Sequence, residues 1–311
     1  MNIDNLLKQI GLFWQYPVIT EKEFYRQNKG DVNYFPFPWA TVIDKHVNQQ
    51  RLLEILKAVI LPNKNYYTCC QHISYHKLVK LWSLLGIGTV YTPHKCLGID
   101  KIGSIKLVAC PLYAVNLEDK TRNEVFNGVD LLNKERKYFY SFAGGYQVNC
   151  YLTDIRLRIF DLNKNGRKDC IIRNTGDWHF NCDVYGGGQD RNGKLNEDQR
   201  HKIKTKLYNS ILLDSRYALA PSGSGPNSIR FWEALGAGSI PVLLADTLEL
   251  PKHALWEKSI VRIKESELAN IDNILGDIDK NEEEERRSNC LKLYQYFRSN
   301  YKNEVKKIEI K

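Results

Sequence analysis

The chain has 311 residues, of which 43% are hydrophobic and 26% charged, a composition typical of a soluble globular protein. A chain of this length is longer than a domain with one hydrophobic core of ordinary size, so two domains are predicted. The net charge of +9 and the pI of about 9.0 favour anionic partners such as nucleotides or phosphorylated sugars. Lys and Arg are spread along the chain without a dense basic run, so no nucleic-acid partner is predicted.

The eight cysteines form no C-x-x-C pair and show no zinc-like spacing with histidine. The N-terminal segment lacks the basic start and apolar core of a secretory signal, and no apolar run approaches the roughly 20 residues that cross a bilayer. We therefore expect a cytoplasmic protein with reduced thiols. The positive charge is compatible with peripheral association with anionic lipid.

The first 40 residues are rich in aromatic side chains, and Pro17, Pro36 and Pro38 exclude a long helix there. We expect these aromatics to pack as a layer over the first domain, with stacking on an acceptor sugar as the alternative. From residue 46 onward, strand and helix alternate. Helical spacing of apolar residues covers 46–60 and 75–85, and β-forming runs cover 65–73, 89–91 and 105–112. This alternation predicts a parallel sheet with helices on its faces.

The polar segment 118–135 is expected to hold the crossing between the domains. Beyond it, strands are predicted over 137–142, 169–173 and 259–263, and helices over 198–213, 266–275 and 282–301.

Residues 215–251 carry the most informative stretch, SRYALAPSGSGPNSIRFWEALGAGSIPVLLADTLELP. It predicts a strand, a turn rich in Gly and Ser, a helix capped by Asn227 or Ser228 and ended by Gly236 and Gly238, and an interior strand over 240–245. A helix that begins after such a turn presents N–H groups and a positive dipole end to an anion. The alternative is an ordinary crossover whose glycines only permit tight packing.

The same stretch resembles the exostosin-type glycosyltransferases, in which A/L-x-P is followed by a glycine turn, S-x-R-x-x-E-A-L, a small-residue loop, I-P-V and a downstream Asp and Pro. KYFYSFAGG, with Arg156 and Arg158 behind it, is similar to the F-x-G segment of that family. YFPFPWATVID and YYTCCQHI match more loosely. The resemblance implies an α/β GT-B architecture, with two Rossmann-like domains and their parallel sheets facing each other across a cleft. The expected parts are an acceptor-binding domain over 1–135, a nucleotide-sugar-binding domain over 136–281, and a terminal helix over 282–311 that packs back on the first domain.

Members of this family are inverting enzymes that mostly use UDP-sugars and need no bound metal, so the resemblance implies no cofactor. An inverting transfer requires a base for the acceptor hydroxyl and positive groups for the departing diphosphate. We expect Arg230 to hold a phosphate, Glu233 to accept ribose hydroxyls or close a capping box with the 227–230 backbone, and Asp246 to touch the donor sugar or form a turn. The full set of expected donor-binding residues is Gly144, Gly145, Arg156, Arg158, Arg173, Ser222, Gly223, Ser224, Asn227, Ser228, Arg230, Glu233 and Asp246.

The catalytic base must come from the first half of the chain. His72 ends a predicted strand and is the first candidate, and Asp44 after PWATVI is its rival. His76, His94 and His179 stay open, and a structural role is the alternative for each histidine.

Two further motifs are expected to carry no chemistry. Asp277-Ile278-Asp279 spells the D-x-D of metal-dependent glycosyltransferases, but it lies between two predicted helices and is expected to be a solvated loop. Residues 185–188 (YGGG) follow no clear strand and are expected to form a mobile loop beside the cleft.

The leading functional hypothesis is transfer of a sugar from a UDP-sugar to a hydroxyl of a glycan, with xylose favoured on family distribution alone. The alternatives are a fucosyltransferase that uses GDP-fucose and a non-catalytic domain that binds sugar nucleotides or glycans. The lack of a membrane anchor sets the chain apart from the Golgi members of the family and predicts a bacterial or viral cytoplasmic enzyme.

Overall fold

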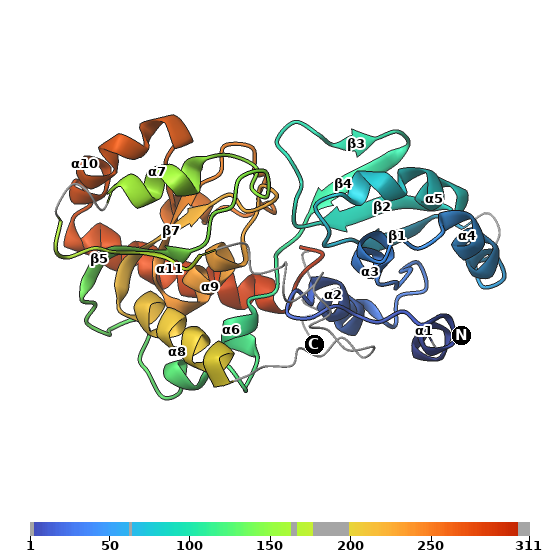
Figure 1. Ribbon diagram of the computed structural model, residues 1–311, viewed down its shortest axis with the longest axis horizontal. Coiled ribbons are helices and arrows are strands. Elements are labelled where there is room, and N and C mark those ends of the chain that lie inside the picture. Colours follow the sequence, from blue (N-terminus) through green and yellow to red (C-terminus); the bar gives the residue numbers. More distant parts are fainter. Residues whose placement is uncertain (1–2, 62–63, 163–166, 177–198, 304–311) are drawn as a thin grey trace, which may run out of the picture.

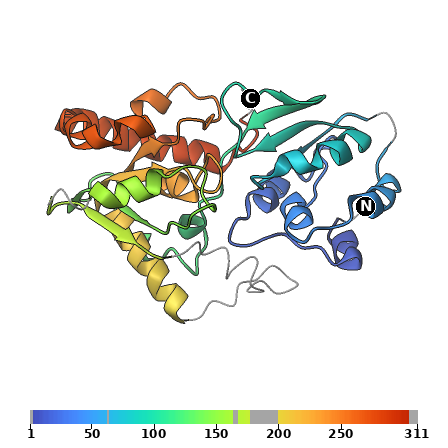
Figure 2. The same cartoon turned by 45° about the horizontal axis from the view of Figure 1, so that its top comes forward.

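A computed structural model describes residues 3–61, 64–162, 167–176 and 199–303. Two domains, each with its own sheet, stand side by side, and the chain crosses between them near the short helix α6, Val115–Glu118 (Figures 1 and 2).

The first domain is built on a four-stranded sheet in the order β1-β2-β4-β3. Three strands are parallel, and the short β3 pairs antiparallel with β4 at the edge. The strands are Tyr66–Cys69 (β1), Ile87–Thr92 (β2), Lys101–Ile102 (β3) and Ile105–Ala109 (β4). The helices are Ile3–Ile10 (α1), Thr20–Asn28 (α2), Trp39–Asp44 (α3), Gln49–Lys57 (α4) and Val79–Leu84 (α5), the last preceded by a 3₁₀ turn at Tyr75–Leu78.

The aromatic N-terminal segment packs over this sheet, as predicted. Trp39 on α3 is fully buried, its Nε1 donates to Thr68 Oγ1 at 2.7 Å, and its ring lies edge-on to Trp82 on α5. The segment holds no long helix, but it does hold three short ones.

The second domain is built on five parallel strands in the order β6-β5-β7-β8-β9. The strands are Tyr138–Gly144 (β5), Ile171–Asn174 (β6), Ser215–Pro221 (β7), Ile240–Leu244 (β8) and Val261–Arg262 (β9). The helices are Ile155–Leu162 (α7), Gln199–Leu213 (α8), Ile229–Ala237 (α9), Ile271–Gly276 (α10) and Lys280–Arg298 (α11), and a 3₁₀ segment at Glu265–Asn270 precedes α10. Every residue of β8 is buried, because helices cover both faces of an interior parallel strand.

Gly238 ends α9 in the left-handed conformation, with a φ of 65°. A side chain would be strained there, and a Cβ would also lie 3.0 Å from the carbonyl oxygen of Leu131. The predicted helix end is therefore confirmed at Gly238.

The crossing lies earlier than residues 118–135. Leu112 and Ala114 already belong to the core of the second domain, and the short helix Val115–Glu118 (α6) packs against α9. The last helix also differs from expectation, because Leu293 and Phe297 of α11 lie in the core of the second domain. It is Tyr301, beyond the helix, that packs among aromatic residues of the first domain.

Two domains, each with a mainly parallel sheet and helices around it, confirm the predicted α/β fold class with its Rossmann-like arrangement.

Candidate functional site

The carboxyl ends of strands from the two sheets meet at Gly225, in the loop after β7. A Cβ at Gly225 would lie 2.6 Å from Ile73 Cγ2, after β1, and 2.9 Å from His94 Nδ1, after β2. The neighbouring Asn227 Nδ2 donates to the carbonyl oxygen of Pro93 at 2.8 Å. In open α/β sheets, ligands bind at these strand ends, so the site is to be sought around this contact.

Two arginines converge on Gly144, at the end of β5. A Cβ at Gly144 would lie 3.1 Å from Arg230 Nη2 and 3.2 Å from Arg156 Nη1. Arg156 is buried, and it donates from Nε to the carbonyl oxygen of Ser222 at 3.0 Å and from Nη1 to that of Gly145 at 3.2 Å. Burial, and then the charge of Arg230, lower the pKa of Arg156 to about 9. Arg156 thus joins the ends of β5 and β7.

Arg230 lies against the same strand end from α9. Its guanidinium covers the ring of Phe142 at 4.5 Å, contacts the ring of Tyr208 at 5.6 Å, and donates from Nη2 to the carbonyl oxygen of Ala143. Among the residues that the structure describes, its buried Nε and Nη1 have no hydrogen-bond partner. Within the described residues, neither Arg230 nor Arg156 forms a salt bridge with a carboxylate.

Three amides of the glycine-rich loop, for which the sequence predicts a phosphate cradle, already have partners. The amide of Ser222 donates to Leu244 at 3.0 Å, that of Gly223 to Gly225 at 2.8 Å, and that of Ser228 to the side chain of Asn227 at 2.8 Å. Ser228 is the residue before α9, but its side chain makes no capping hydrogen bond. A phosphate would therefore meet the two arginines rather than these three amides.

Asn227 has a structural role in this arrangement. Besides the contact with Pro93, its Oδ1 accepts from Trp232 Nε1 at 3.2 Å. The side-chain amide therefore holds the start of α9 against the first domain, and the predicted role as a helix cap is wrong.

Glu233 is buried and held by two hydrogen-bond donors. It is 2% exposed, Oε1 accepts from the amide of Asn116 at 3.2 Å, and Oε2 accepts from the hydroxyl of Tyr208 at 2.7 Å. Burial raises the pKa of this carboxyl. The capping-box interpretation is wrong, because α8 and the crossing segment supply its donors. A contact with ribose stays a prediction that would require the carboxylate to leave both partners.

The remaining donor-side candidates lie nearer the surface. Asp246 is exposed in a turn after β8, as in the turn-forming alternative, and its Oδ1 accepts from the amide of Glu265 at 3.0 Å. Arg173 is exposed on β6, and Arg158 is half-buried on α7. Ser224 is half-buried in the loop after β7.

On the first domain, the two rival bases prove to be partners. His72 Nε2 lies 2.9 Å from Asp44 Oδ1, and the amide of Ser74 donates to His72 Nδ1 at 2.8 Å. Gln15 Nε2 donates to the other oxygen of Asp44 at 2.5 Å. The side chains of His72 and Asp44 are 13% and 7% exposed, so this polar group lies largely inside the domain.

A buried carboxyl stands beside this group, and sequence reasoning missed it. Glu21 of α2 is fully enclosed, and its Oε1 accepts from the amides of Ala40 at 3.0 Å and Gln71 at 3.1 Å. Burial, reinforced by the charge of Asp44, raises the pKa of Glu21 to about 8. Nothing in the segment TEKEFYRQN distinguishes this glutamate from its exposed neighbours, so no sequence signal marks it.

The other histidines differ in their surroundings. His94 is buried with an unpartnered Nδ1 that faces Gly225, and burial lowers its pKa to about 3. His76 is exposed. His179 and the glycine-rich residues 185–188 lie outside the described residues.

In the part of the chain that the structure describes, no three His, Cys, Asp or Glu side chains gather as a metal site. Within the D-x-D motif, Asp279 is the N-cap of α11 and accepts from the amide of Glu282 at 2.9 Å. Asp277 ends α10.

Comparison with known proteins adds family membership. A family model for the Exostosin GT47 domain matches residues 108–278. Among curated proteins, the chain is 26% identical over 190 residues to the exostosin-1 homolog of Caenorhabditis elegans, covering 60% of this chain and 46% of that protein. It is 28% identical over 148 residues to exostosin-1 of Drosophila melanogaster, covering 46% of this chain and 18% of that protein. The chain thus spans less than half the length of either relative.

Among solved structures, the N-terminal domain of Candida albicans trehalose-6-phosphate phosphatase is similar over 85% of this chain and 74% of that one. The TM-score is 0.44 and the sequence identity 11%, a likeness that carries no functional argument.

These matches correct the predicted location and settle the family. The expectation of a bacterial or viral cytoplasmic enzyme is wrong. It rested on a separation from the Golgi members of the family, whereas both curated relatives are animal exostosins. Within the described residues, no helix has the length and apolar character needed to span a membrane. The family model covers more than half of the chain and includes Arg156, Arg230 and the loop after β7. The chain therefore belongs to the Exostosin GT47 family of glycosyltransferases.

Proposed function

We propose that the protein is an inverting glycosyltransferase that moves a sugar from a UDP-sugar to a hydroxyl of a glycan, without a bound metal. Family membership supports glycosyl transfer. The nucleotide, the stereochemistry and the independence from metal are the proposal, and UDP-xylose is the donor to try first.

One observation carries the proposal: Arg156 and Arg230 share the surroundings of Gly144 without a carboxylate partner among the described residues. Cations inside a protein are costly unless an anion or several acceptors compensate them. A nucleotide diphosphate supplies that negative charge, and two guanidinium groups would stabilise it further as it leaves.

Binding requires a local rearrangement of Arg230. The space beside its guanidinium and Tyr208 is only about 10 Å³, room for about one water molecule. We propose that Arg230 turns out of this space when the donor binds, and that its Nε and Nη1 then meet phosphate oxygens beside Gly144.

The proposed base is Asp44, oriented by His72. Its carboxylate would take the proton of the acceptor hydroxyl while the acceptor oxygen bonds to the anomeric carbon. In the same step the bond from that carbon to the phosphate oxygen breaks, and UDP leaves with the electron pair. Because His72 accepts an N–H on Nδ1, its Nε2 carries the proton and donates it to Asp44 as a fixed hydrogen bond.

The test is calorimetric titration of UDP and GDP into the parent protein and into Arg156→Gln and Arg230→Gln. Arg262→Gln is the control, because Arg262 pairs with Glu257 on the surface. We expect UDP to bind the parent and each cleft variant to weaken binding by about 10–100-fold, as for the loss of hydrogen bonds to charged groups. Binding of GDP alone would overturn the UDP proposal and favour the fucosyltransferase. Binding of UDP without turnover of any donor and acceptor pair would favour the non-catalytic domain.

A further inference from the structure

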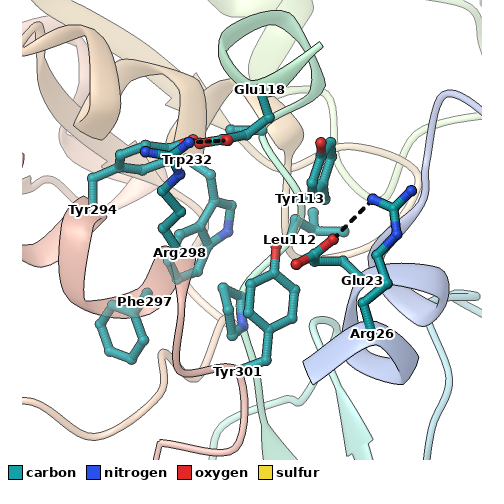
Figure 3. A pocket seen from close by; sticks show the side chains of 12 residues that line it. Glu23, Arg26, Leu112, Tyr113, Glu118, Trp232, Tyr294, Phe297, Arg298 and Tyr301 are labelled. Atoms are coloured by element: carbon teal, nitrogen blue, oxygen red, sulfur yellow. Dashed lines mark hydrogen bonds and ion pairs between the residues drawn. The ribbon is translucent and has the colours of Figure 1, made fainter. Parts of the chain in front are cut away.

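A second pocket lies at the junction of the two domains, lined by residues other than those of the arginine pair and the His72–Asp44 pair. Its volume is about 240 Å³, and its walls come from α2, the crossing segment 111–118, α9, the end of α11 and Tyr301 (Figure 3). Pockets for drug-sized ligands measure about 300–1,000 Å³, so this one suits a single small ring.

The charges in this pocket cancel in pairs. On one side, Glu118 accepts from Tyr294 Oη at 2.5 Å and from Arg298 at 2.8 Å. On the other, Arg26 contacts Glu23 at 3.2 Å. Figure 3 shows the two pairs on opposite sides, with Tyr301 between them. Two carboxylates neutralised by two guanidinium groups offer acceptors and donors without a net charge to attract a phosphate or a cation.

Aromatic side chains also contribute to the wall. Tyr113 of the crossing segment and Tyr294 of α11 are half-buried, whereas Trp232 of α9 and Phe297 of α11 are only 1% exposed and offer almost no surface to a ligand. The arginine side chains are more than half exposed, 56% for Arg26 and 52% for Arg298, which puts the polar groups at the mouth. A ring with hydroxyls on its edge and C–H groups on its faces matches this wall, because the tyrosine rings can pack against C–H groups while the ion pairs bind hydroxyls.

We infer that this junction pocket binds one neutral sugar ring of a glycan, at a site separate from donor binding. The inference rests on the pocket itself and not on the nucleotide or the mechanism proposed above. The paired charges disfavour a uronic acid, a sugar phosphate or a nucleotide in this place.

The pocket is built from both domains, so its shape depends on their arrangement. Trp232 in its wall donates to Asn227, and Asn227 in turn donates to Pro93 of the first domain. A bound sugar would touch α2 of one domain and α9 and α11 of the other, and would favour the arrangement in which these elements enclose it.

The experiment is saturation-transfer NMR on the full chain with D-glucose, D-galactose, D-xylose, lactose and cellobiose, with glucose 6-phosphate and glucuronic acid as the anionic arm. We expect at least one neutral sugar to bind, and Glu118→Gln to weaken it by about tenfold or more, as for one lost hydrogen bond to a charged group. Tyr296→Phe is the matched control, because Tyr296 lies on the same helix and bonds to Asn303 outside the pocket.

Glu23→Gln on the opposite side repeats the test should Glu118→Gln fail to fold. UDP affinity, measured on the same variants, should equal that of the parent, which separates this site from the donor site. The inference is overturned if no neutral sugar binds, if both variants bind as the parent does, or if the anionic sugars bind more tightly.

Discussion

His72 and Asp44 form one hydrogen-bonded pair at the end of β1, with 2.9 Å between Nε2 and Oδ1. The amide of Ser74 occupies the other ring nitrogen, so the imidazole can only present a proton to the carboxylate. The geometry thus gives the two residues unequal roles, with His72 as the donor that orients Asp44.

The first prediction follows from the different roles of these two residues. Asp44→Asn should lower kcat by about 10²–10⁴, the usual contribution of a general base, and His72→Ala should lower it less. His76→Ala is the control, since that histidine is exposed four residues away. Steady-state kinetics with the best donor and acceptor pair measures the effect, and parental turnover in Asp44→Asn would remove Asp44 from the mechanism.

The second prediction concerns pH and Glu21. The folded state holds a proton on Glu21 up to a pH of about 8, whereas the unfolded chain releases it near 4.5. The stabilisation is therefore complete below pH 4.5 and is lost as pH rises to about 8. Glu21→Gln keeps the acceptor for the amides of Ala40 and Gln71 and removes the titration.

Urea unfolding of the parent and Glu21→Gln at pH 5, 6, 7 and 8 checks this dependence. The difference between the two free energies of unfolding should shift in favour of the variant by on the order of a few kcal/mol across that range. Taking the difference cancels other titrations, including that of His94, whose lowered pKa weakens the fold below about pH 6.5. A difference that stays constant with pH would show that Glu21 does not titrate in this way.

The third prediction concerns Arg136, which is buried among backbone carbonyls. It donates to Leu131 at 3.0 Å, Leu213 at 2.9 Å, Ser215 at 3.0 Å and Ala237 at 2.8 Å. Arg136→Met should lower the free energy of unfolding by about 3–5 kcal/mol, because it leaves several buried oxygens without donors. Arg136→Lys should recover only part, since an ammonium lacks the planar fork. Unchanged urea midpoints in both variants would contradict this role.

The fourth prediction concerns an ion pair between the domains. Lys95 is 2% exposed and contacts Glu249 of the second domain and Asp100 of the first. Lys95→Met should lower the free energy of unfolding by about 1–3 kcal/mol. Lys206→Met, which removes an exposed pair with Glu124, should change it by less than about 0.5 kcal/mol. Urea titrations of the two variants measure the effect. Equal losses in the free energy of unfolding would mean that burial of Lys95 does not increase the contribution of its ion pair to stability.

The fifth prediction is that turnover survives EDTA. Asp279 caps α11, which leaves its D-x-D motif a structural task at a helix start. Activity assays before and after chelation, and with Asp277→Asn, should agree within error. Loss of turnover on chelation, restored by Mn²⁺ or Mg²⁺, would return that motif to the mechanism.

Most elements of the second domain could be predicted closely because each has a strong local cause, but α7 at 155–162 is absent from the prediction. The apolar run after Gly238 is too short for a buried helix, and it forms β8 at 240–244. The aromatic start of the chain was harder to interpret, since prolines and short helices leave no periodic pattern. Helices α1, α2 and α3 are consequently absent from the prediction.

The sequence predicts on which elements the site residues lie, but not where their side chains point. Helical periodicity places Arg230 and Glu233 on α9, but Tyr208 of α8 and Asn116 of the crossing segment decide where Glu233 points. Those partners lie 25 and 117 positions away in the chain. The pairing of His72 with Asp44 depends in the same way on α3 meeting β1. Contacts of this kind depend on tertiary packing, which no local pattern encodes.

Gly225 has a consequence for catalysis that goes beyond the flexibility of its loop. Ile73 and His94 occupy the volume in which any other residue would carry its Cβ, so the missing Cβ permits the close approach of the two domains. A single displacement requires the acceptor oxygen and the anomeric carbon to come within about 3–3.5 Å while different domains hold them. A methyl group at position 225 would hold the two domains farther apart, so the acceptor oxygen and the anomeric carbon would be more distant although every proposed catalytic side chain was still present.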